Sequence, residues 1–417
     1  MNIQEIKNIF KNTIWLGIGE GISRLFLLFL FIYAARTLGP EGFGVFNFAL
    51  AIVSFFVIFS NLGISDITTR ELAKDKEKIN HYPGILLLRI LLSIGAFIIV
   101  FAVSFFLTQD EYIRKIIWIL GMYVLTHNFL ILVYSFFRAR RQMKYEALIR
   151  ILEAFLTAAI GFLMLIKIPS VINLSYAFLL ATLVITVFFI IFFSIIIKPI
   201  WISWDFNLWK KFLKVSWPIG VAYAFGMVYI RIDSVIMGFL GQIVEVGWYS
   251  AAYKIAGVLI VPSSLIGASF FPVLSKLFQE SKEKFQETFK FYIKLMIILS
   301  VFIIIIGLIF SSYIVNIFYG QMFSPAVLAL QILIIMAGLN YIYSPFYLVL
   351  VATNNQKKIF WISFIGAIIN IILNIILIPY YSLYGAAVAT LITYIFLVVS
   401  AVYYSKPILL SSEAGKQ

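Results

Sequence analysis

The sequence predicts an all-α integral membrane protein with twelve transmembrane helices in two six-helix lobes. Three observations support this: an apolar composition, twelve apolar stretches of spanning length, and a motif that recurs half a chain later. Of the 417 residues, 63% are hydrophobic and 12% are charged, and the mean hydropathy is +1.04. Because a soluble domain is far more polar, this composition excludes one.

The apolar stretches are long enough to cross a bilayer, since a spanning helix needs about 20 mostly apolar residues. They cover roughly 13–35, 45–65, 84–107, 113–136, 148–166, 171–197, 215–240, 248–274, 291–313, 325–350, 359–378 and 383–404. The longest polar links, near 66–83, 137–147, 198–214 and 275–290, have room for one short helix each.

Basic residues concentrate in alternate links, and this pattern explains the net charge of +14. With both termini in the cytoplasm, the inner links hold most of the lysines and arginines, among them Arg138, Arg140 and Arg141, whereas the outer links hold few. This is the positive-inside rule, so we expect a multi-pass protein of the cell (cytoplasmic) membrane with cytoplasmic N- and C-termini. The positive charge then sets the orientation of the spans and attracts anionic lipid headgroups, and a nucleic-acid partner is not expected.

A short motif appears twice, which predicts an internal repeat. "RTLGPEGFGVF" at 36–46 follows the first span, and "GFLGQIVEVGWY" at 238–249 follows the seventh. In both, Leu-Gly opens the link and Gly plus an aromatic residue closes it. We therefore expect an N-terminal lobe over 1–197 and a C-terminal lobe over 215–417, related by a pseudo-two-fold axis along the membrane normal. Chance similarity between apolar segments is the alternative.

The link between the lobes, 198–214, has the pattern of a helix that lies in the membrane interface. Its apolar residues include Trp204, Leu208 and Phe212 at helical spacing, and Lys210 and Lys211 lie on the other side. Such an amphipathic helix at the cytoplasmic surface would join two lobes that rock against each other, or it would be a plain interfacial anchor.

Eight ionisable residues fall inside the predicted spans. Each costs about 2.5–3.5 kcal/mol at the bilayer centre, so most must face a wet interior or one another. They are Glu20, Arg24, Arg89, Arg150, Glu153, Arg231, Asp233 and Lys254. Five are basic and three are acidic, so a cavity that they line has a surplus of positive charge and should attract an anion.

Some of these charges have candidate partners nearby in sequence. Glu20 and Arg24 are four residues apart on one helical face, and Arg150 and Glu153 are three apart, so each pair can be a local ion pair. Arg231 and Asp233 lie on opposite sides of their helix, so at least one of them needs a partner on another span.

The chain lacks the residue patterns of an enzyme. His81 and His127 are far apart and there is no cysteine, so no metal site is expected. No phosphate-binding loop of the GxxxxGK[ST] type and no nucleophile with its base are found, so no cofactor is expected. His127, in an apolar span, is interpreted as a hydrogen-bonded core residue, with a proton relay as the alternative.

Two segments resemble a known family. "IYAARTLGPEGFGVFNFALAIVSFF" with "NLGISDITTRELA" (61–73), and "RIDSVIMGFLGQIVEVGWYSAAYKIAG" (231–257), are similar to the polysaccharide-biosynthesis, or oligosaccharide flippase, family. That family belongs to the multidrug/oligosaccharidyl-lipid/polysaccharide exporter superfamily. The resemblance implies a MATE-like V-shaped bundle that flips a polyprenyl (undecaprenyl) diphosphate-linked oligosaccharide from the inner to the outer leaflet by alternating access.

The resemblance also implies roles for the membrane-embedded charges. Arg24, Arg231 and Lys254 would bind the diphosphate in a cationic central cavity, with Arg89 and Arg150 at its entrance. Glu20, Glu153 and Asp233 would bind a coupling proton or sodium ion, or pair with the cations. We expect a monomer that is not an enzyme. A multidrug cation antiporter of the same superfamily and a lipid II-type flippase are the alternatives.

No motif of the sequence indicates which sugar the implied oligosaccharide substrate contains. Asparagines within the spans are candidates for saccharide contacts, although they also serve helix packing in membranes. These candidates are Asn128, Asn340, Asn370 and Asn374.

Overall fold

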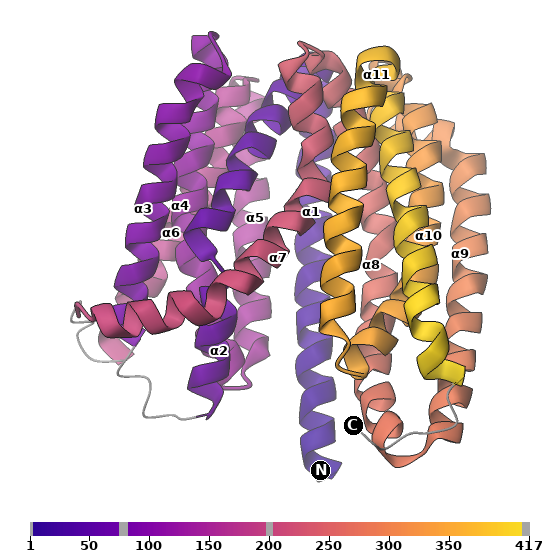
Figure 1. The fold of residues 1–417 in the computed structure, drawn as a ribbon. Helices are drawn as coiled ribbons and strands as arrows, with labels where there is room; N and C mark the ends of the chain where they lie inside the picture. The colour runs from indigo at the N-terminus through magenta and orange to yellow at the C-terminus, as the bar shows by residue number, and fades with distance from the viewer. Residues whose placement is uncertain (1–2, 75–81, 197–202, 411–417) are drawn as a thin grey trace. The chain divides into compact units, whose positions relative to one another are not determined.

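The computed structural model describes residues 3–74, 82–196 and 203–410, and its regular structure in these ranges is helical. The helices are α1 (Ile3–Asn61), α2 (Ile64–Lys74), α3 (Tyr82–Leu107), α4 (Glu111–Ala139), α5 (Met143–Lys167), α6 (Val171–Ile196), α7 (Phe206–Phe239), α8 (Ile243–Glu280), α9 (Lys282–Phe318), the short 3₁₀ turn η2 (Gln321–Phe323), α10 (Ala326–Ala352) and α11 (Gln356–Leu410). Figure 1 shows their course. The all-α prediction is confirmed.

Apolar spans account for most of the chain. Among the described residues, nine helices are long and apolar enough to cross a membrane, or ten when the bent helix α7 counts as one span. The exact number of twelve stays a prediction. Two of the helices are far longer than one crossing requires, because α1 has 59 residues and α11 has 55.

Both long helices contain a break at which the chain reverses (Figure 1). In α1 the break is Gly39, with φ 69° and ψ 177°, directly before Pro40. In α11 it is Ser382, with φ 50° and ψ −130°. A positive φ is readily adopted by glycine and costs other residues free energy. Gly241, the counterpart of Gly39 in the recurring motif, also has a positive φ of 76°, so both copies mark a turn of the backbone.

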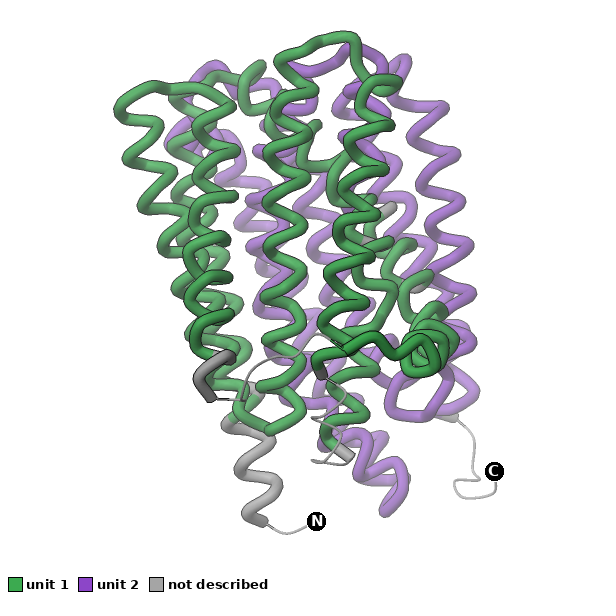
Figure 2. Tube along the Cα trace, turned by 90° about the vertical axis from the view of Figure 1, so that its left-hand side faces the viewer, with its two compact units in different colours: residues 1–227 green, residues 228–417 purple. Residues whose placement is uncertain are grey.

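The chain divides into two compact units, residues 1–227 and 228–417, coloured separately in Figure 2. The boundary falls inside α7, so residues 206–227 of this helix belong to the first unit. The lobe boundaries inferred from sequence, at 197 and 215, stay a prediction. Each unit is described by itself below.

In the first unit, the beginning of α7 lies crosswise to the long helices at one end of the unit (Figure 1). Its apolar side chains pack into a core with α2, α3, α4, α5 and α6, and Trp209 Nε1 donates a hydrogen bond of 2.8 Å to the carbonyl of Gly84. The helix begins only at Phe206, where Asp205 accepts from the backbone N–H of Leu208 at 2.9 Å, so residues 203–205 of the predicted 198–214 helix are not helical. Residues 198–202 lie outside the described residues.

The same end of the first unit carries the basic links. Arg70, Arg138 and Lys144 lie on α2 and on either side of the α4–α5 turn, whereas the links α3–α4 and α5–α6 at the opposite end hold Asp110, Glu111 and few bases. The asymmetry of charge read from the sequence is therefore an asymmetry of the folded unit. The side of the membrane to which this end belongs stays a prediction.

The second unit is built around buried aromatic residues of α8, α9 and α10. Tyr292 and Tyr341 are fully buried, and Tyr292 stacks on Phe270 with ring centroids 4.3 Å apart. Large apolar side chains also cover the outside of both units, such as Phe188 at 57% and Ile309 at 69% exposure. In a protein that spans a membrane this outer surface contacts lipid chains.

Candidate functional site

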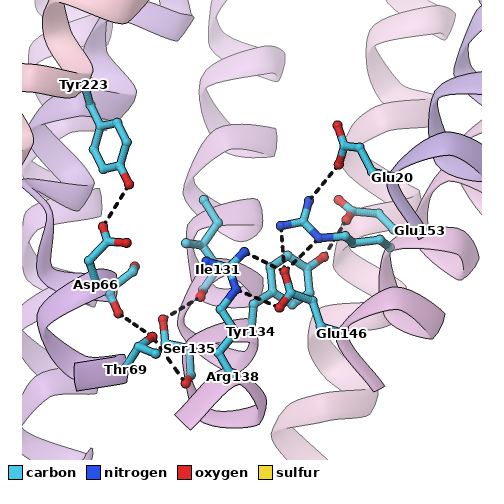
Figure 3. A network of polar contacts seen from close by, with 12 residues as sticks. Glu20, Asp66, Thr69, Ile131, Tyr134, Ser135, Arg138, Glu146, Glu153 and Tyr223 are labelled. Carbon is cyan, nitrogen blue, oxygen red and sulfur yellow. Dashed lines mark hydrogen bonds and ion pairs between the residues drawn. The ribbon is translucent and has the colours of Figure 1, made fainter. Parts of the chain in front are cut away.

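A buried carboxylate, Glu146 on α5, is the centre of a polar network in the first unit (Figure 3). Arg138 at the end of α4 donates to it through Nε and Nη2, both at 2.7 Å, which is a bidentate geometry. Arg150, one turn further along α5, approaches the same carboxylate at 2.9 Å. Glu146 is 0% exposed, so its charge is stable there only because two guanidinium groups bind it.

The network continues from Arg150 to α1. Its Nη1 lies 3.7 Å from Glu20, and Glu20 accepts a hydrogen bond of 2.8 Å from Arg24 Nε. The side chains of Arg24 and Glu20 are 46% and 42% exposed. The charges therefore run from a fully buried centre at Glu146 to an accessible end at Arg24.

A second branch connects Arg150 with Glu153 through an aromatic ring. The Arg150 guanidinium stands 4.5 Å from the ring centroid of Tyr134, a cation–π geometry, and the Tyr134 hydroxyl donates to Glu153 at 3.1 Å. Glu153 is also contacted by His127 Nδ1 at 2.7 Å and by the Thr182 hydroxyl at 3.2 Å. Two helices, α4 and α6, thus supply polar partners to this carboxylate.

One contact ties α2 to α7 beside this network. The Tyr223 hydroxyl donates to Asp66 Oδ2 at 3.0 Å, as Figure 3 shows. Thr69, on the next turn of α2, donates to the carbonyl of Ser135 on α4 at 3.4 Å. The polar groups therefore link α1, α2, α4, α5 and α7 inside one unit.

Arg89 on α3 lies apart from the network and is 2% exposed. Its guanidinium donates to the carbonyls of Ser60 at 3.1 Å and Asn128 at 2.9 Å, and to the side chain of Asn61. It therefore binds the end of α1 to α4. Its role at a cavity entrance stays a prediction.

In the second unit, the three ionisable residues of the predicted spans lie on the second half of α7 and on α8. Asp233 is 1% exposed; it accepts from the Tyr249 hydroxyl and, at 2.7 Å, from the backbone N–H of Ser234. The Tyr249 hydroxyl also lies 3.4 Å from the hydroxyl of Thr390 on α11. The carboxylate is thus held where three helices meet.

Arg231 and Lys254 belong to the same region of the second unit. Both side chains are half-buried. Arg231 lies close enough for its charge to act on both Asp233 and Lys254. Asp233 is the acidic residue among the three, and the expected surplus of positive charge around a cavity stays a prediction.

The structure supports some of the expected pairs and rearranges others. Glu20 and Arg24 form the predicted pair across one helical turn. Arg150 turns to Glu146 and Glu20, while Glu153 binds His127, Tyr134 and Thr182. Sequence reasoning missed Glu146 because it lies in the polar link 137–147, although its spacing of four from Arg150 was a usable signal.

The asparagines considered for sugar contacts are largely committed to helix packing. Asn370 and Asn374 are buried and bind each other, and Asn370 also donates to Thr393 at 3.2 Å. Asn128 is buried and donates to the Ser60 hydroxyl at 2.6 Å. Asn340 contacts the hydroxyl of Ser263 at 3.2 Å. In the described ranges, no group of three or more His, Asp and Glu residues could hold a metal ion.

The fold resembles those of solved membrane transporters. The lipid II flippase MurJ in its inward closed conformation has a TM-score of 0.78 and 18% identity, covering 93% of this chain and 87% of that one. An inward-facing multidrug resistance MATE family transporter of the MOP superfamily has a TM-score of 0.70 and 15% identity, covering 98% of this chain and 95% of that one. At these identities the likeness concerns the fold.

The chain belongs to the polysaccharide biosynthesis protein family, whose model matches residues 9–278. The MatE family model matches residues 218–376. This confirms the resemblance seen in residues 33–73 and 231–257. The chain is therefore a membrane transport protein of the superfamily that contains both families.

Two relatives align along almost the whole chain. An uncharacterized membrane protein of Methanocaldococcus jannaschii is 26% identical over 410 residues, covering 93% of this chain and 95% of the relative. A putative O-antigen transporter of Escherichia coli K12 is 23% identical over 401 residues, covering 94% of this chain and 95% of the relative.

Proposed function

We propose that this protein is a flippase that moves a polyprenyl-diphosphate-linked oligosaccharide from the inner to the outer leaflet of the cytoplasmic membrane. The observation that carries the proposal is the match to the polysaccharide biosynthesis family over residues 9–278. The alignment with the putative O-antigen transporter, over 94% of this chain, supports it. The protein acts as a transporter rather than an enzyme, works as a monomer, and keeps both termini in the cytoplasm.

The chemistry of the substrate explains the membrane-embedded cations. A diphosphate headgroup is anionic and strongly hydrated, so it needs a polar path, while its prenyl tail stays in lipid. Arg24 of the first unit and Arg231 and Lys254 of the second bind the diphosphate. Arg24 suits this role because its side chain is 46% exposed, although Glu20 already pairs with it. Arg89 and Arg150 act at the cavity entrance.

The acidic residues have a different task in this proposal. Glu20, Glu153 and Asp233 pair with the cations when no substrate is bound, or they take up a coupling proton or sodium ion. Glu153 has a titratable partner for such a role, because His127 Nδ1 lies 2.7 Å from its carboxylate. Alternating access between the two units then releases the headgroup on the outer side.

The first test is removal of two cations of the second unit. We expect Arg231→Gln with Lys254→Gln to abolish export of a lipid-linked glycan, because the diphosphate loses two of its three proposed counter-charges. The measurement is translocation of a fluorescent polyprenyl-diphosphate oligosaccharide into the outer leaflet of proteoliposomes. Lys276→Gln with Lys357→Gln is the matched control, since these lysines lie at helix ends outside the cluster and their loss leaves export intact.

The amount of folded protein in the membrane is measured in parallel and should equal that of the wild type. Wild-type translocation rates in the Arg231/Lys254 variant would remove these residues from the mechanism. No translocation by the wild type of any polyprenyl-linked glycan would overturn the proposed function itself.

A multidrug cation antiporter is the second candidate, because the MatE model matches residues 218–376. Such a protein takes organic cations and needs an acidic cavity, whereas the spans predicted from the sequence hold five basic and three acidic residues. Expression in a drug-sensitive host separates the two: a raised tolerance to cationic dyes supports the antiporter. Unchanged tolerance, together with glycan export, supports the flippase.

A further inference from the structure

Two adjoining cavities lie at the turn between α4 and α5, on the outside of the first unit. One, of about 660 Å³, is polar and is lined by Leu72, Arg140, Arg141 and Gln142 among others. The other, of about 530 Å³, is lined mainly by aromatic and aliphatic side chains of α4, α5 and α6. Phe136, Arg140 and Gln142 line both, so a polar mouth continues into an apolar groove.

The turn itself holds Arg141 in an unusual backbone conformation. Its N–H donates to the carbonyl of Arg138 and that of Gln142 to Phe137, and Arg141 has a φ of 57°. This is the Schellman ending of a helix, in which glycine or asparagine usually occupies the left-handed position. The same hydrogen bonds recur at Gly241 and at Asn354, with φ of 76° and 58°. Only at the α4–α5 turn, among these three, does a long cation hold that position.

The charge of the polar mouth is positive and accessible. Arg140 and Arg141 are both exposed, and the Arg140 guanidinium stands 4.2 Å from the ring centroid of Phe136, which fixes its direction. The carboxylate of Glu146, on the adjoining turn of α5, is fully buried and is already bound by Arg138 and Arg150. Glu146 is therefore not the carboxylate that neutralises Arg140 and Arg141, and these two arginines can attract an anion.

The apolar groove opens to the surface that contacts lipid. Tyr145, Leu148, Leu152 and Phe188 line it and are 50%, 44%, 45% and 57% exposed. On a soluble protein such side chains would form an exposed hydrophobic patch prone to association, but on a membrane-spanning unit they contact the lipid hydrocarbon. A polar mouth with two arginines above an apolar groove has the form of a single-lipid site.

We propose that this surface binds one anionic glycerophospholipid, with its phosphate on Arg140 and Arg141 and one acyl chain in the groove. The site lies on the outer surface of the first unit, and its groove of about 530 Å³ is suited to one acyl chain rather than to a much longer polyprenyl tail. The inference requires only that the unit spans a membrane, and it is independent of the substrate that the protein moves.

Native mass spectrometry of the full-length protein in detergent tests the proposal, with phosphatidylglycerol and phosphatidylcholine as probes. We expect the wild type to retain phosphatidylglycerol in preference to phosphatidylcholine. Arg140→Gln with Arg141→Gly should weaken phosphatidylglycerol binding by about 25-fold, because each arginine near a membrane surface contributes about a factor of 5. Glycine fits the left-handed position, so this variant keeps its fold, which thermal unfolding verifies.

Two further variants make the test specific. Arg114→Gln removes an arginine that stacks on Phe105 at 4.8 Å at the other end of the unit, and it should leave lipid binding unchanged. Leu148→Trp fills the groove while both arginines remain, and it should reduce phosphatidylglycerol binding.

Three results would overturn the proposal. They are equal retention of the two phospholipids by the wild type, full phosphatidylglycerol binding by the Arg140/Arg141 variant, and displacement of phosphatidylglycerol by an equimolar amount of a polyprenyl phosphate. The last result would assign the groove to the carrier lipid instead.

Discussion

Glu146 shows how single residues keep charge inside an apolar unit. It is fully buried, yet it accepts a bidentate pair of hydrogen bonds from Arg138 and a further contact from Arg150. Burial of a carboxylate without such partners costs several kcal/mol. Glu20, at the other end of the network, is 42% exposed and pairs with Arg24 near the surface. Within one unit, glutamate thus occurs both as a fully buried ion-pair centre, at Glu146, and as a half-exposed ion-pair partner, at Glu20.

The two glutamates should therefore differ in their contribution to stability. Glu146→Gln removes the bidentate partner of Arg138 and one of the two carboxylates that Arg150 contacts, and it should lower the free energy of unfolding by about 3 kcal/mol. Glu20→Gln removes a half-exposed pair and should cost about 0.5 kcal/mol. Equilibrium unfolding in mixed micelles measures both. Equal losses for the two variants would contradict the assignment of Glu146 as the centre of the network.

At the scale of elements, α7 is joined to the α1–α2 turn by two glycines. A Cβ on Gly220 would lie 2.8 Å from the Cα of Leu62, a backbone atom that cannot move aside easily. Gly63, with φ 73°, leaves no more room, since a Cβ there would lie 2.6 Å from Ile219. The two segments touch backbone to backbone, which only glycine permits.

This contact predicts opposite effects for two glycines of the same helix. Gly220→Ala should destabilise the protein by about 1–3 kcal/mol through overpacking. Gly226→Ala is the matched control, because a Cβ there meets nothing within 4 Å, and its higher helix propensity should leave stability equal or slightly raised. Thermal unfolding in detergent compares them. A harmless Gly220→Ala would show that α7 does not depend on this close approach.

The elements themselves were largely predictable, because apolar runs of spanning length and polar links mark the helices directly. The break at Gly39 also follows from local sequence, because it lies between two predicted spans. The beginning of α7 at Phe206 differs from the predicted helix over 198–214. Contacts between helices were not predictable. Glu153 and His127 are 26 residues apart, and Tyr223 and Asp66 are 157 apart, so no local spacing brings them together.

At the scale of the whole molecule, the surplus of basic residues within the spans favours an anionic cargo. Under the proposed function, a headgroup with two negative charges moves outward across the membrane. An inside-negative potential drives this by about 2.3 kcal/mol per charge for each 100 mV, or about 4.6 kcal/mol in total. The acidic residues are then needed only to return the empty carrier.

Translocation should consequently respond to voltage. In proteoliposomes with a potassium diffusion potential, we expect faster outward movement of the labelled lipid-linked glycan when the interior is negative, and slower movement when the potential is collapsed. A protonophore experiment at constant voltage serves as the control. A rate that ignores voltage but follows a pH gradient would instead place the energy source in proton uptake.

The pair of Arg138 and Glu146 has a consequence for biogenesis. The two residues stand on either side of the α4–α5 turn, only eight positions apart, and their contact is complete within this hairpin. Each charge is therefore neutralised as soon as the two segments have left the translocon, before any other helix arrives. The α4–α5 hairpin is thus suited to enter the bilayer as one unit, with the Glu146 carboxylate already paired.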